Sequence, residues 1–395
     1  MSLLEWSLAL GLAFALQATA LALVNLRRYR RADLTPRLAP TSISVCIPAR
    51  NEESNVEACV ASLLASGQGT TGDGLAIEVL CYDDQSTDRT PEILARLVAS
   101  DARVRVVRTV PLPARWNGKQ HACWRLAQEA RGEWLLFTDA DVRFAPDALR
   151  RSVGTAQAMN VALLSTVPHQ LVGSIGEALL VPMIHVFLLS YLPIRRMRST
   201  LEPAASAGCG QFLLARADAY RATGGHAAFP ESMHDGIRMP RHFRTGGFRT
   251  DLFDGTDLVA CRMYRGLRSS WHGFTKNAFE GLGNVGLLVL LTVLHLTGHV
   301  WPWCVLAWWA LSQALGWPAL GSLAGGMAAA AVAVAILGRV ALARRFRQPI
   351  WIALAHPVAV LLMTAVQWQS LLLSLRGRRQ WKGRIAEGDT AGAAT

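Results

Sequence analysis

Three acidic segments in the middle of the chain carry the residues best suited to chemistry. They are Tyr-Asp-Asp-Gln-Ser-Thr-Asp at 82–88, Thr-Asp-Ala-Asp at 138–141 and His-Asp at 234–235. The middle segment follows an apolar run, 132–137, that is typical of a buried strand. Side chains two residues apart on a strand point to the same side, so Asp139 and Asp141 should converge. Two such carboxylates suit a divalent cation, Mg²⁺ or Mn²⁺, that keeps positions open for substrate phosphates; a solvated polar turn is the alternative.

These acidic segments lie in a block that alternates between strand-like and helix-like stretches. Strands are expected at 42–47, 77–82, 104–107, 161–167 and in the stretch that ends at Asp139. The alternation predicts an α/β domain with a largely parallel sheet. Asp83, Asp84, Asp139 and Asp141 all follow strands. We therefore expect them to cluster at the carboxyl edge of the sheet, where open α/β sheets bind ligands.

Apolar segments of membrane length flank this block. Residues 3–24 are almost continuously apolar, long enough to cross a bilayer as a helix, and four arginines follow within 27–31. A cleavable signal peptide would carry its positive charge before a shorter apolar run, so a membrane anchor is predicted. Basic residues beside a first helix tend to stay inside, so the block should face the cytoplasm from the inner (plasma) membrane.

Beyond residue 284 three further apolar runs predict membrane segments and a multi-pass protein. They lie at 285–311, 317–337 and 350–375. Basic clusters at 339–347 and 376–384 flank the last run, and both cannot be cytoplasmic if it crosses once. Either that run is re-entrant, or the first is two short segments, or the charge rule fails here. For the shorter apolar run at 178–192, an interfacial segment and a buried core helix are both open.

The distribution of charge argues against a nucleic-acid partner, and the spacing of the cysteines argues against a zinc site. Much of the net charge of +12 lies in basic clusters beside the apolar runs, where attraction to anionic lipid accounts for it. Because no basic stripe interleaved with aromatic residues is present, no nucleic acid is expected as a partner. The seven cysteines show neither Cys-x-x-Cys nor zinc spacing, so we interpret them as reduced core residues of a cytosolic compartment.

Five motifs in the block resemble those of family 2 glycosyltransferases with the GT-A fold. They are Ile-Pro-Ala-Arg-Asn-Glu-Glu at 47–53, Tyr-Asp-Asp-Gln-Ser-Thr-Asp-Arg-Thr at 82–90, Trp-Asn-Gly-Lys at 116–119, Thr-Asp-Ala-Asp at 138–141 and His-Asp at 234–235. The chain is most similar to membrane-anchored bacterial enzymes of the hopanoid-associated and carotenoid-glycosylating type. The resemblance implies an anchor at 1–26, a Rossmann-like GT-A domain at 41–284, a transmembrane region at 285–376 and a basic, then flexible, tail at 377–395.

The resemblance also implies which residues bind the nucleotide of the donor. Pro48, Arg50 and Glu52 would line the nucleotide pocket, with Glu52 accepting hydrogen bonds from the ribose or base. Asp83 or Asp84 would hydrogen-bond the base or ribose, a role that suits a carboxylate because it offers only acceptors. The implied donor is a UDP- or GDP-sugar.

Three further residues are implied at the diphosphate. Lys119 would act as its counter-charge, and an exposed lysine at a helix start is the alternative. Asp139 would reach the ribose or the metal, and Asp141 would hold the metal that bridges both phosphates. That divalent cation, Mg²⁺ or Mn²⁺, would neutralise charge on the departing nucleoside diphosphate as a Lewis acid.

The last acidic segment is implied to carry the general base. Asp235 would take the proton of an acceptor hydroxyl that attacks the sugar carbon opposite the leaving group, which inverts the anomeric centre. A helix-capping role for Asp235 is the alternative, and His234 is a second candidate base. Gly-Cys-Gly-Gln at 208–211 resembles the loop that flanks the acceptor site, although a plain turn fits as well.

One motif of the family is missing. Processive members carry Gln-x-x-Arg-Trp, whereas this chain has Arg-Ser-Ser-Trp at 268–271, which argues against polymer synthesis. The expected function is therefore inverting, metal-dependent transfer of a single sugar to a hydroxyl on a membrane lipid. A polyprenyl phosphate is the alternative acceptor, and a noncatalytic nucleotide-binding membrane scaffold is the alternative from another class.

Overall fold

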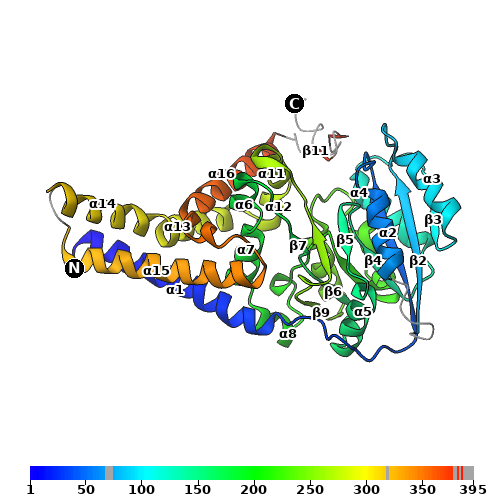
Figure 1. The fold of residues 1–395 in the computed structure, drawn as a ribbon, viewed down its shortest axis with the longest axis horizontal. Helices are drawn as coiled ribbons and strands as arrows, with labels where there is room; N and C mark the ends of the chain where they lie inside the picture. Colours follow the sequence, from blue (N-terminus) through cyan, green and yellow to red (C-terminus); the bar gives the residue numbers. More distant parts are fainter. Residues whose placement is uncertain (67–73, 317–319, 377–379, 382–383, 386–395) are drawn as a thin grey trace. The chain divides into compact units, whose positions relative to one another are not determined.

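The chain divides into two compact units (Figure 1). The computed structural model describes residues 1–66, 74–316, 320–376, 380–381 and 384–385. The first unit, here called the membrane-helix unit, comprises Met1–Arg28, Val172–Pro193 and Tyr264–Leu373. The second, the sheet unit, comprises Tyr29–Leu171, Ile194–Met263 and the described residues after Leu373. The tail expected at 377–395 lies almost entirely outside the described residues.

A seven-stranded sheet forms the centre of the sheet unit. Its strands lie in the order β3 (Val104–Val106), β2 (Leu75–Asp83), β1 (Thr41–Ala49), β4 (Trp134–Phe137), β8 (Leu213–Arg216), β6 (Leu163–Ser165) and β9 (Thr250–Leu252). Neighbouring strands are parallel except at β8, which runs antiparallel to both β4 and β6. The mostly parallel α/β sheet predicted from the sequence is thus confirmed.

Helices cover both faces of this sheet. One layer consists of α2 (Val56–Ser66), α3 (Thr90–Ser100) and α5 (Ala148–Ala158), and the other of α4 (Gly118–Glu129), α9 (Ala217–Ala222) and α10 (Asp235–Thr245). Side chains alternate along β1, so Val45 packs with the first layer and Cys46 with the second. In α2 the apolar residues at i, i+3 and i+4 spacing, among them Val56, Val60 and Leu63, are fully buried.

A smaller sheet and several short helices complete the sheet unit. The small sheet has the order β5 (Val142–Phe144), β10 (Val259–Cys261) and β7 (His169–Gln170). The other short elements are α8 (Ile194–Ser199), η1 (Pro203–Ala205), η2 (Gly225–Ala228), β11 (Gln380–Trp381) and β12 (Arg384–Ile385). The chain leaves the large sheet after β4 and enters the small one at β5. Asp139 and Asp141 therefore lie in the turn between the two sheets, and the strand that was expected to end at Asp139 ends at Phe137.

The Glu78 carboxylate of β2 ties together β1, β3 and the segment that precedes β4. It accepts hydrogen bonds from Ser44 Oγ (2.5 Å), the Arg131 N–H (2.7 Å) and Arg105 Nη1 (3.0 Å). Ser44 Oγ in turn accepts a hydrogen bond of 2.8 Å from the N–H of Gly132, just before β4. Burial opposes ionisation of Glu78, but these donors outweigh it and hold the pKa of its carboxyl below the ordinary value.

Long apolar helices form most of the membrane-helix unit. They are α1 (Leu3–Arg28), α13 (Val285–His299), α14 (Trp301–Leu315), α15 (Ser322–Arg345) and α16 (His356–Leu375). Among the described residues four segments are long and apolar enough to cross a membrane, with α13 and α14 counted as one. This agrees with one N-terminal and three C-terminal segments. The shorter elements are α6 (Ile175–Leu180), α7 (Met183–Tyr191), α11 (Gly266–Thr275), α12 (Ala278–Leu282) and η3 (Ile350–Ala353).

The first C-terminal segment consists of two consecutive helices that join at Val300. Hydrogen bonds run from Val300 N to Leu296 O and from Cys304 N to Val300 O, each 3.2 Å, so α14 follows α13 directly. Pro302 lies in the first turn of α14, where its missing N–H is tolerated. The apolar run at 285–311 therefore comprises α13 and most of α14.

Small residues let α1 lie directly against α15, as Figure 1 shows. Thr19 Oγ1 of α1 donates a hydrogen bond of 3.1 Å to the carbonyl of Val334. A methyl group on Gly338 would lie 2.7 Å from the same Thr19 oxygen, so only glycine permits this approach. On another side of α1, Asn25 Nδ2 donates to the carbonyls of Leu189 and Leu192 at 2.8 and 2.7 Å, which attaches the run at 178–192 to this unit.

We predict that Glu78→Gln lowers the stability of the protein at neutral pH by about 1–2 kcal/mol, because charge-assisted hydrogen bonds are lost. The lowered pKa of Glu78 means that its contribution is complete above the ordinary value of 4.5 and is lost as the pH falls through the folded-state value. The difference in stability between Glu78→Gln and the parent should stay constant from about pH 7 to pH 5 and become smaller at lower pH. Apparent unfolding temperatures of the detergent-solubilised protein measure it.

The control is Glu92→Gln, because the Glu92 side chain is 74% exposed and should leave stability unchanged. A difference that widens on acidification would contradict the assignment of Glu78 as an ionised anchor.

Candidate active site

The acidic segments lie at one edge of the large sheet. Strands β1, β2 and β4 are parallel neighbours, and they end at Ala49, Asp83 and Phe137. The segments that follow them carry Arg50 and Glu52, then Asp84, then Asp139 and Asp141. The position of these residues at the carboxyl edge is thus as the alternation of strands and helices predicted. Pro48 is buried within β1, where it pairs with Tyr82 of β2.

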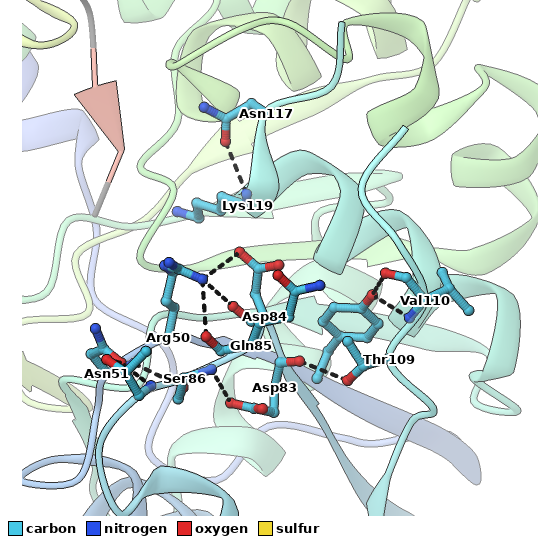
Figure 2. Close-up of polar contacts among 12 residues, drawn as sticks. Arg50, Asn51, Asp83, Asp84, Gln85, Ser86, Thr109, Val110, Asn117 and Lys119 are labelled. Carbon is cyan, nitrogen blue, oxygen red and sulfur yellow. Dashed lines mark hydrogen bonds and ion pairs between the residues drawn. The ribbon is translucent and has the colours of Figure 1, made fainter. Parts of the chain in front are cut away.

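Arg50 holds the segment that follows β2 (Figure 2). Its Nη1 donates to the carbonyls of Asp84 and Gln85, the second at 3.2 Å, and lies 3.8 Å from the Asp84 carboxylate. The Asp84 side chain is only 4% exposed, so this charge is paired and almost removed from solvent. Arg50 and Asp84, predicted separately as nucleotide contacts, therefore form one ion-paired group.

Asn51 connects the same two loops and was missed by the sequence reasoning. Its N–H donates to Ser86 Oγ at 2.9 Å, and its Oδ1 accepts from the N–H of Thr87 at 2.8 Å (Figure 2). Its φ of 54° lies in the left-handed region, which asparagine tolerates better than most residues. Asp83 Oδ1 accepts from the N–H of Ser86 at 3.3 Å, so part of its acceptor capacity serves the loop itself.

Lys119 brings together two acidic residues that lie far apart in the sequence. Its Nζ is 2.8 Å from Asp139 Oδ1 and 3.0 Å from Asp235 Oδ2, and it donates to the carbonyl of Gly210 at 3.4 Å. Burial disfavours the charged ammonium, but the two carboxylates outweigh burial and hold the pKa of Lys119 well above its ordinary value. Lys119 is thus a partly buried, ion-paired residue and not an exposed lysine at the start of α4.

The start of α4 positions Lys119 and also holds the loop before Asp235. Asn117 Oδ1 caps the helix by accepting from the N–H of Lys119 at 2.9 Å. The N–H of Asn117 donates to the carbonyl of Pro230 at 2.7 Å, and Gln120 Nε2 donates to that of Ser232 at 3.1 Å. Gln120 is a further residue that the sequence reasoning missed, because nothing in its neighbourhood marks a contact with a loop more than 100 residues away.

Glycines make room for Asp235. A methyl group on Gly210 would lie 2.1 Å from Asp235 Oδ1, and one on Gly236 would lie 2.6 Å from the carbonyl of Gly208. The Gly-Cys-Gly-Gln segment therefore packs tightly against the first turn of α10. Asp235 Oδ1 accepts from the N–H of Gly236 at 2.8 Å, so the carboxylate contacts both its own helix and Lys119.

Asp235 remains ionised although it is buried. Burial alone would raise its pKa, but the charges of Lys119 and His226, together with the Lys119 hydrogen bond, hold the pKa of Asp235 below its ordinary value. His234 is the N-cap residue of α10, and Asp235 is the first residue of the helix. Trp271, the last residue of the Arg-Ser-Ser-Trp segment, belongs to the membrane-helix unit.

Asp141 has the properties of a cation ligand. Burial, followed by the negative charges of Asp139 and Glu52, raises the pKa of Asp141 to about 6. Its Oδ1 is buried and has no hydrogen-bond partner among the residues that the structure describes. In the same part of the chain no three His, Cys, Asp or Glu side chains converge as metal ligands. A cation bound here would therefore rely on one or two carboxylates, with phosphate or water oxygens completing its shell.

Comparisons with known proteins agree with this geometry. Residues 44–223 match the model of the family described as Glycosyl transferase family 2. The 4,4'-diaponeurosporenoate glycosyltransferase of Staphylococcus aureus strain N315 is 26% identical over 285 residues, which cover 71% of this chain and 72% of that protein. The protein of the same name from the bovine strain RF122 / ET3-1 is 26% identical over 304 residues, covering 75% and 77%.

One solved structure has the same fold along nearly the whole chain. The mannosyltransferase from Pyrobaculum calidifontis, solved in complex with GDP-Man and Mn²⁺, is 20% identical with a TM-score of 0.55 and covers 97% of this chain and 100% of its own. Together with the family match, this confirms the resemblance that the motifs predicted. Residues 44–223 therefore carry a family 2 glycosyltransferase domain with the GT-A fold, and the chain resembles the carotenoid-glycosylating enzymes.

Proposed function

We propose that this glycosyltransferase moves a single sugar from a UDP- or GDP-sugar to a hydroxyl on a membrane lipid, with inversion of the anomeric centre. The observation that carries the proposal is the contact of Lys119 with both Asp139 and Asp235. It joins the residue expected at the diphosphate and cation to the residue expected at the acceptor. Bond breaking and proton removal then occur at the two ends of one side-chain cluster.

The loops after β1 and β2 form the proposed nucleotide site. The Arg50–Asp84 ion pair and the hydrogen bonds of Asn51 hold both loops in one arrangement without a ligand. The N–H of Glu52 donates to Thr90 Oγ1 at 2.8 Å, and Glu52 Oε2 accepts from Asn55 Nδ2 at 2.9 Å, so this carboxylate is also oriented. Carboxylate oxygens that are already oriented can accept hydrogen bonds from the N–H and O–H groups of a base and ribose at a low cost in entropy.

Asp139 and Asp141 are the proposed ligands of a divalent cation, Mg²⁺ or Mn²⁺. Oδ1 of Asp141 has no hydrogen-bond partner among the described residues, and the negative charges of Asp139 and Glu52 repel this carboxylate. A cation would provide a partner for that oxygen and would reduce the repulsion. When bound, the cation would neutralise charge on the departing nucleoside diphosphate. The structural relative from Pyrobaculum calidifontis was solved with Mn²⁺, which supports this assignment.

Asp235 is the proposed general base. As the acceptor oxygen bonds to the anomeric carbon and the bond from that carbon to the diphosphate breaks, the hydroxyl proton would pass to Asp235. In the structure Lys119 contacts the carboxylate of Asp235. An incoming diphosphate that attracts this ammonium would leave Asp235 free to accept the proton.

Two observations support a lipid acceptor at the cytoplasmic face of a membrane. Four helical segments of the described chain are able to cross a bilayer, and the Staphylococcus aureus relatives are named for a carotenoid-type acceptor. Four arginines within 27–31 lie at the C-terminal end of the first of these helices and just after it, which favours a cytoplasmic sheet unit. Nucleotide sugars made in the cytoplasm would then reach the site directly.

We predict that Asp235→Asn lowers turnover by about 10²–10⁴-fold, because the amide keeps the shape of the side chain but cannot act as the base. The affinity for the nucleotide should change little. Transfer of labelled sugar into extracted lipid measures turnover, and calorimetry with UDP and GDP measures affinity.

Asp218→Asn is the matched control, since the Asp218 side chain is 66% exposed in the same unit. Near-parental turnover of Asp235→Asn would contradict the role of Asp235 as the base. It would indicate that the acceptor is an already anionic group such as a polyprenyl phosphate. A collapse of nucleotide affinity would instead place Asp235 in the donor site.

Removal of the divalent cation should weaken nucleotide binding. In calorimetry we expect tighter binding of UDP or GDP in Mn²⁺ than in EDTA, because a diphosphate completes the shell of the cation. Asp141→Asn should lose this difference, whereas Asp218→Asn should keep it. Equal affinity with and without the cation in the parent protein would exclude the proposed metal site.

The sheet unit should be inaccessible from outside intact cells. We expect Ser100→Cys, an exposed position in α3, to react with an impermeant maleimide only after the cells are opened. The background variant is Cys304→Ser, because Cys304 is an exposed cysteine in α14. Labelling of intact cells beyond that of the background would place the sheet unit outside and remove cytoplasmic nucleotide sugars as donors.

A further inference from the structure

Several ionisable side chains are buried in the long apolar helices of the membrane-helix unit. Among them are His295 and His299 of α13, Arg339 of α15 and His356 of α16, none of which is more than 6% exposed. Ionisable residues are rare inside membrane helices because they are costly to remove from water, and those present usually bind something. The proposed transfer reaction uses none of the four.

The three histidines form a contiguous group between α13 and α16. His356 Nε2 and His299 Nδ1 are 3.2 Å apart, with the rings edge-on and their centroids 5.0 Å apart. The ring of His295 is 6.4 Å from that of His299, and Phe187 and Tyr191 of α7 pack against it. Helices α7, α13 and α16 therefore all contribute to this group.

Arg339 of α15 has most of its hydrogen-bond donors unused. Nη1 donates to the carbonyl of Pro182 at 3.4 Å. Nε and Nη2 are buried and have no hydrogen-bond partner within the described residues.

The chain offers Arg339 no carboxylate. From 285 to 375 the sequence has no Asp and no Glu. The membrane-helix unit holds Glu5, Glu177 and Glu280, and no ion pair joins any of them to Arg339 in the part of the chain that is described. Glu177 is already engaged, since it accepts from the N–H groups of Gly173 and Gly266 at 2.7 and 2.6 Å. A buried guanidinium without a counter-charge is strongly unfavourable.

We propose that Arg339 binds the phosphate of an anionic membrane phospholipid. The planar guanidinium presents Nε and Nη2 side by side, which matches two oxygens of a phosphate. Basic positions between membrane helices bind phospholipid head groups in this way. A lipid is favoured over free phosphate because the surrounding helices are apolar and suit acyl chains. The site is independent of the proposed sugar acceptor.

The test uses the full-length protein in nanodiscs of phosphatidylcholine, with and without added phosphatidylglycerol. Phosphatidylglycerol should raise the apparent unfolding temperature of the parent, because a ligand that binds the folded state stabilises it. In Arg339→Gln the affinity for phosphatidylglycerol, measured by native mass spectrometry, should fall by about tenfold or more. Arg344→Gln, an exposed position on the same helix, should behave like the parent.

Two further arms separate this site from its alternatives. Inorganic phosphate added to phosphatidylcholine nanodiscs should not stabilise the parent; stabilisation equal to that by phosphatidylglycerol would overturn the choice of a lipid. Arg339→Lys, which keeps the charge but loses the planar fork, should bind phosphatidylglycerol with intermediate affinity and covers the case in which Arg339→Gln does not fold. Equal effects of phosphatidylglycerol on the parent, Arg339→Lys and Arg339→Gln would overturn the proposal.

Discussion

The buried ammonium of Lys119, held between Asp139 and Asp235, is the interaction on which the arrangement of the site depends. It joins the start of α4, the turn after β4 and the first turn of α10, three segments separated by up to 116 residues. A buried ion of this kind is tolerated only when its partners are close and well oriented. The tight packing of Gly210 and Gly236 then follows, because any side chain at Gly210 would displace the Asp235 carboxylate.

The sheet makes this convergence possible by its strand directions. Parallel neighbours β1, β2 and β4 deliver their following loops to one edge. Strand β8 runs antiparallel to β4, so the segment that precedes β8, including Gly210, arrives at the same edge. Four loops from distant parts of the sequence thereby meet without any strain in the sheet itself. The catalytic assignment depends on this topology as much as on the acidic motifs.

Local patterns in the sequence were sufficient for the elements and for the edge at which the acids lie. The apolar spacing in α2 and the apolar strands are local signals, and the structure follows them. Contacts between residues that are distant in the sequence could not be predicted from local patterns. The contact of Arg50 with Asp84, and that of Lys119 with two acids, depend on distances across the tertiary fold. The turn at Asp139 was also missed, because β4 ends where the chain crosses to a second sheet that no local pattern revealed.

The two units differ in how their buried charged groups are paired, and this difference follows from their composition. In the sheet unit, the partly buried Arg50 and Lys119 each have a carboxylate partner, and Asp141 Oδ1, which lies near other negative charges, is among the buried atoms without a hydrogen-bond partner in the described chain. In the membrane-helix unit, acids are almost absent, and Nε and Nη2 of Arg339 are among such atoms. Uncompensated charge in a folded protein is costly, so each excess indicates a ligand of opposite sign. The same physical rule therefore points to a cation at the sheet edge and to an anion among the membrane helices.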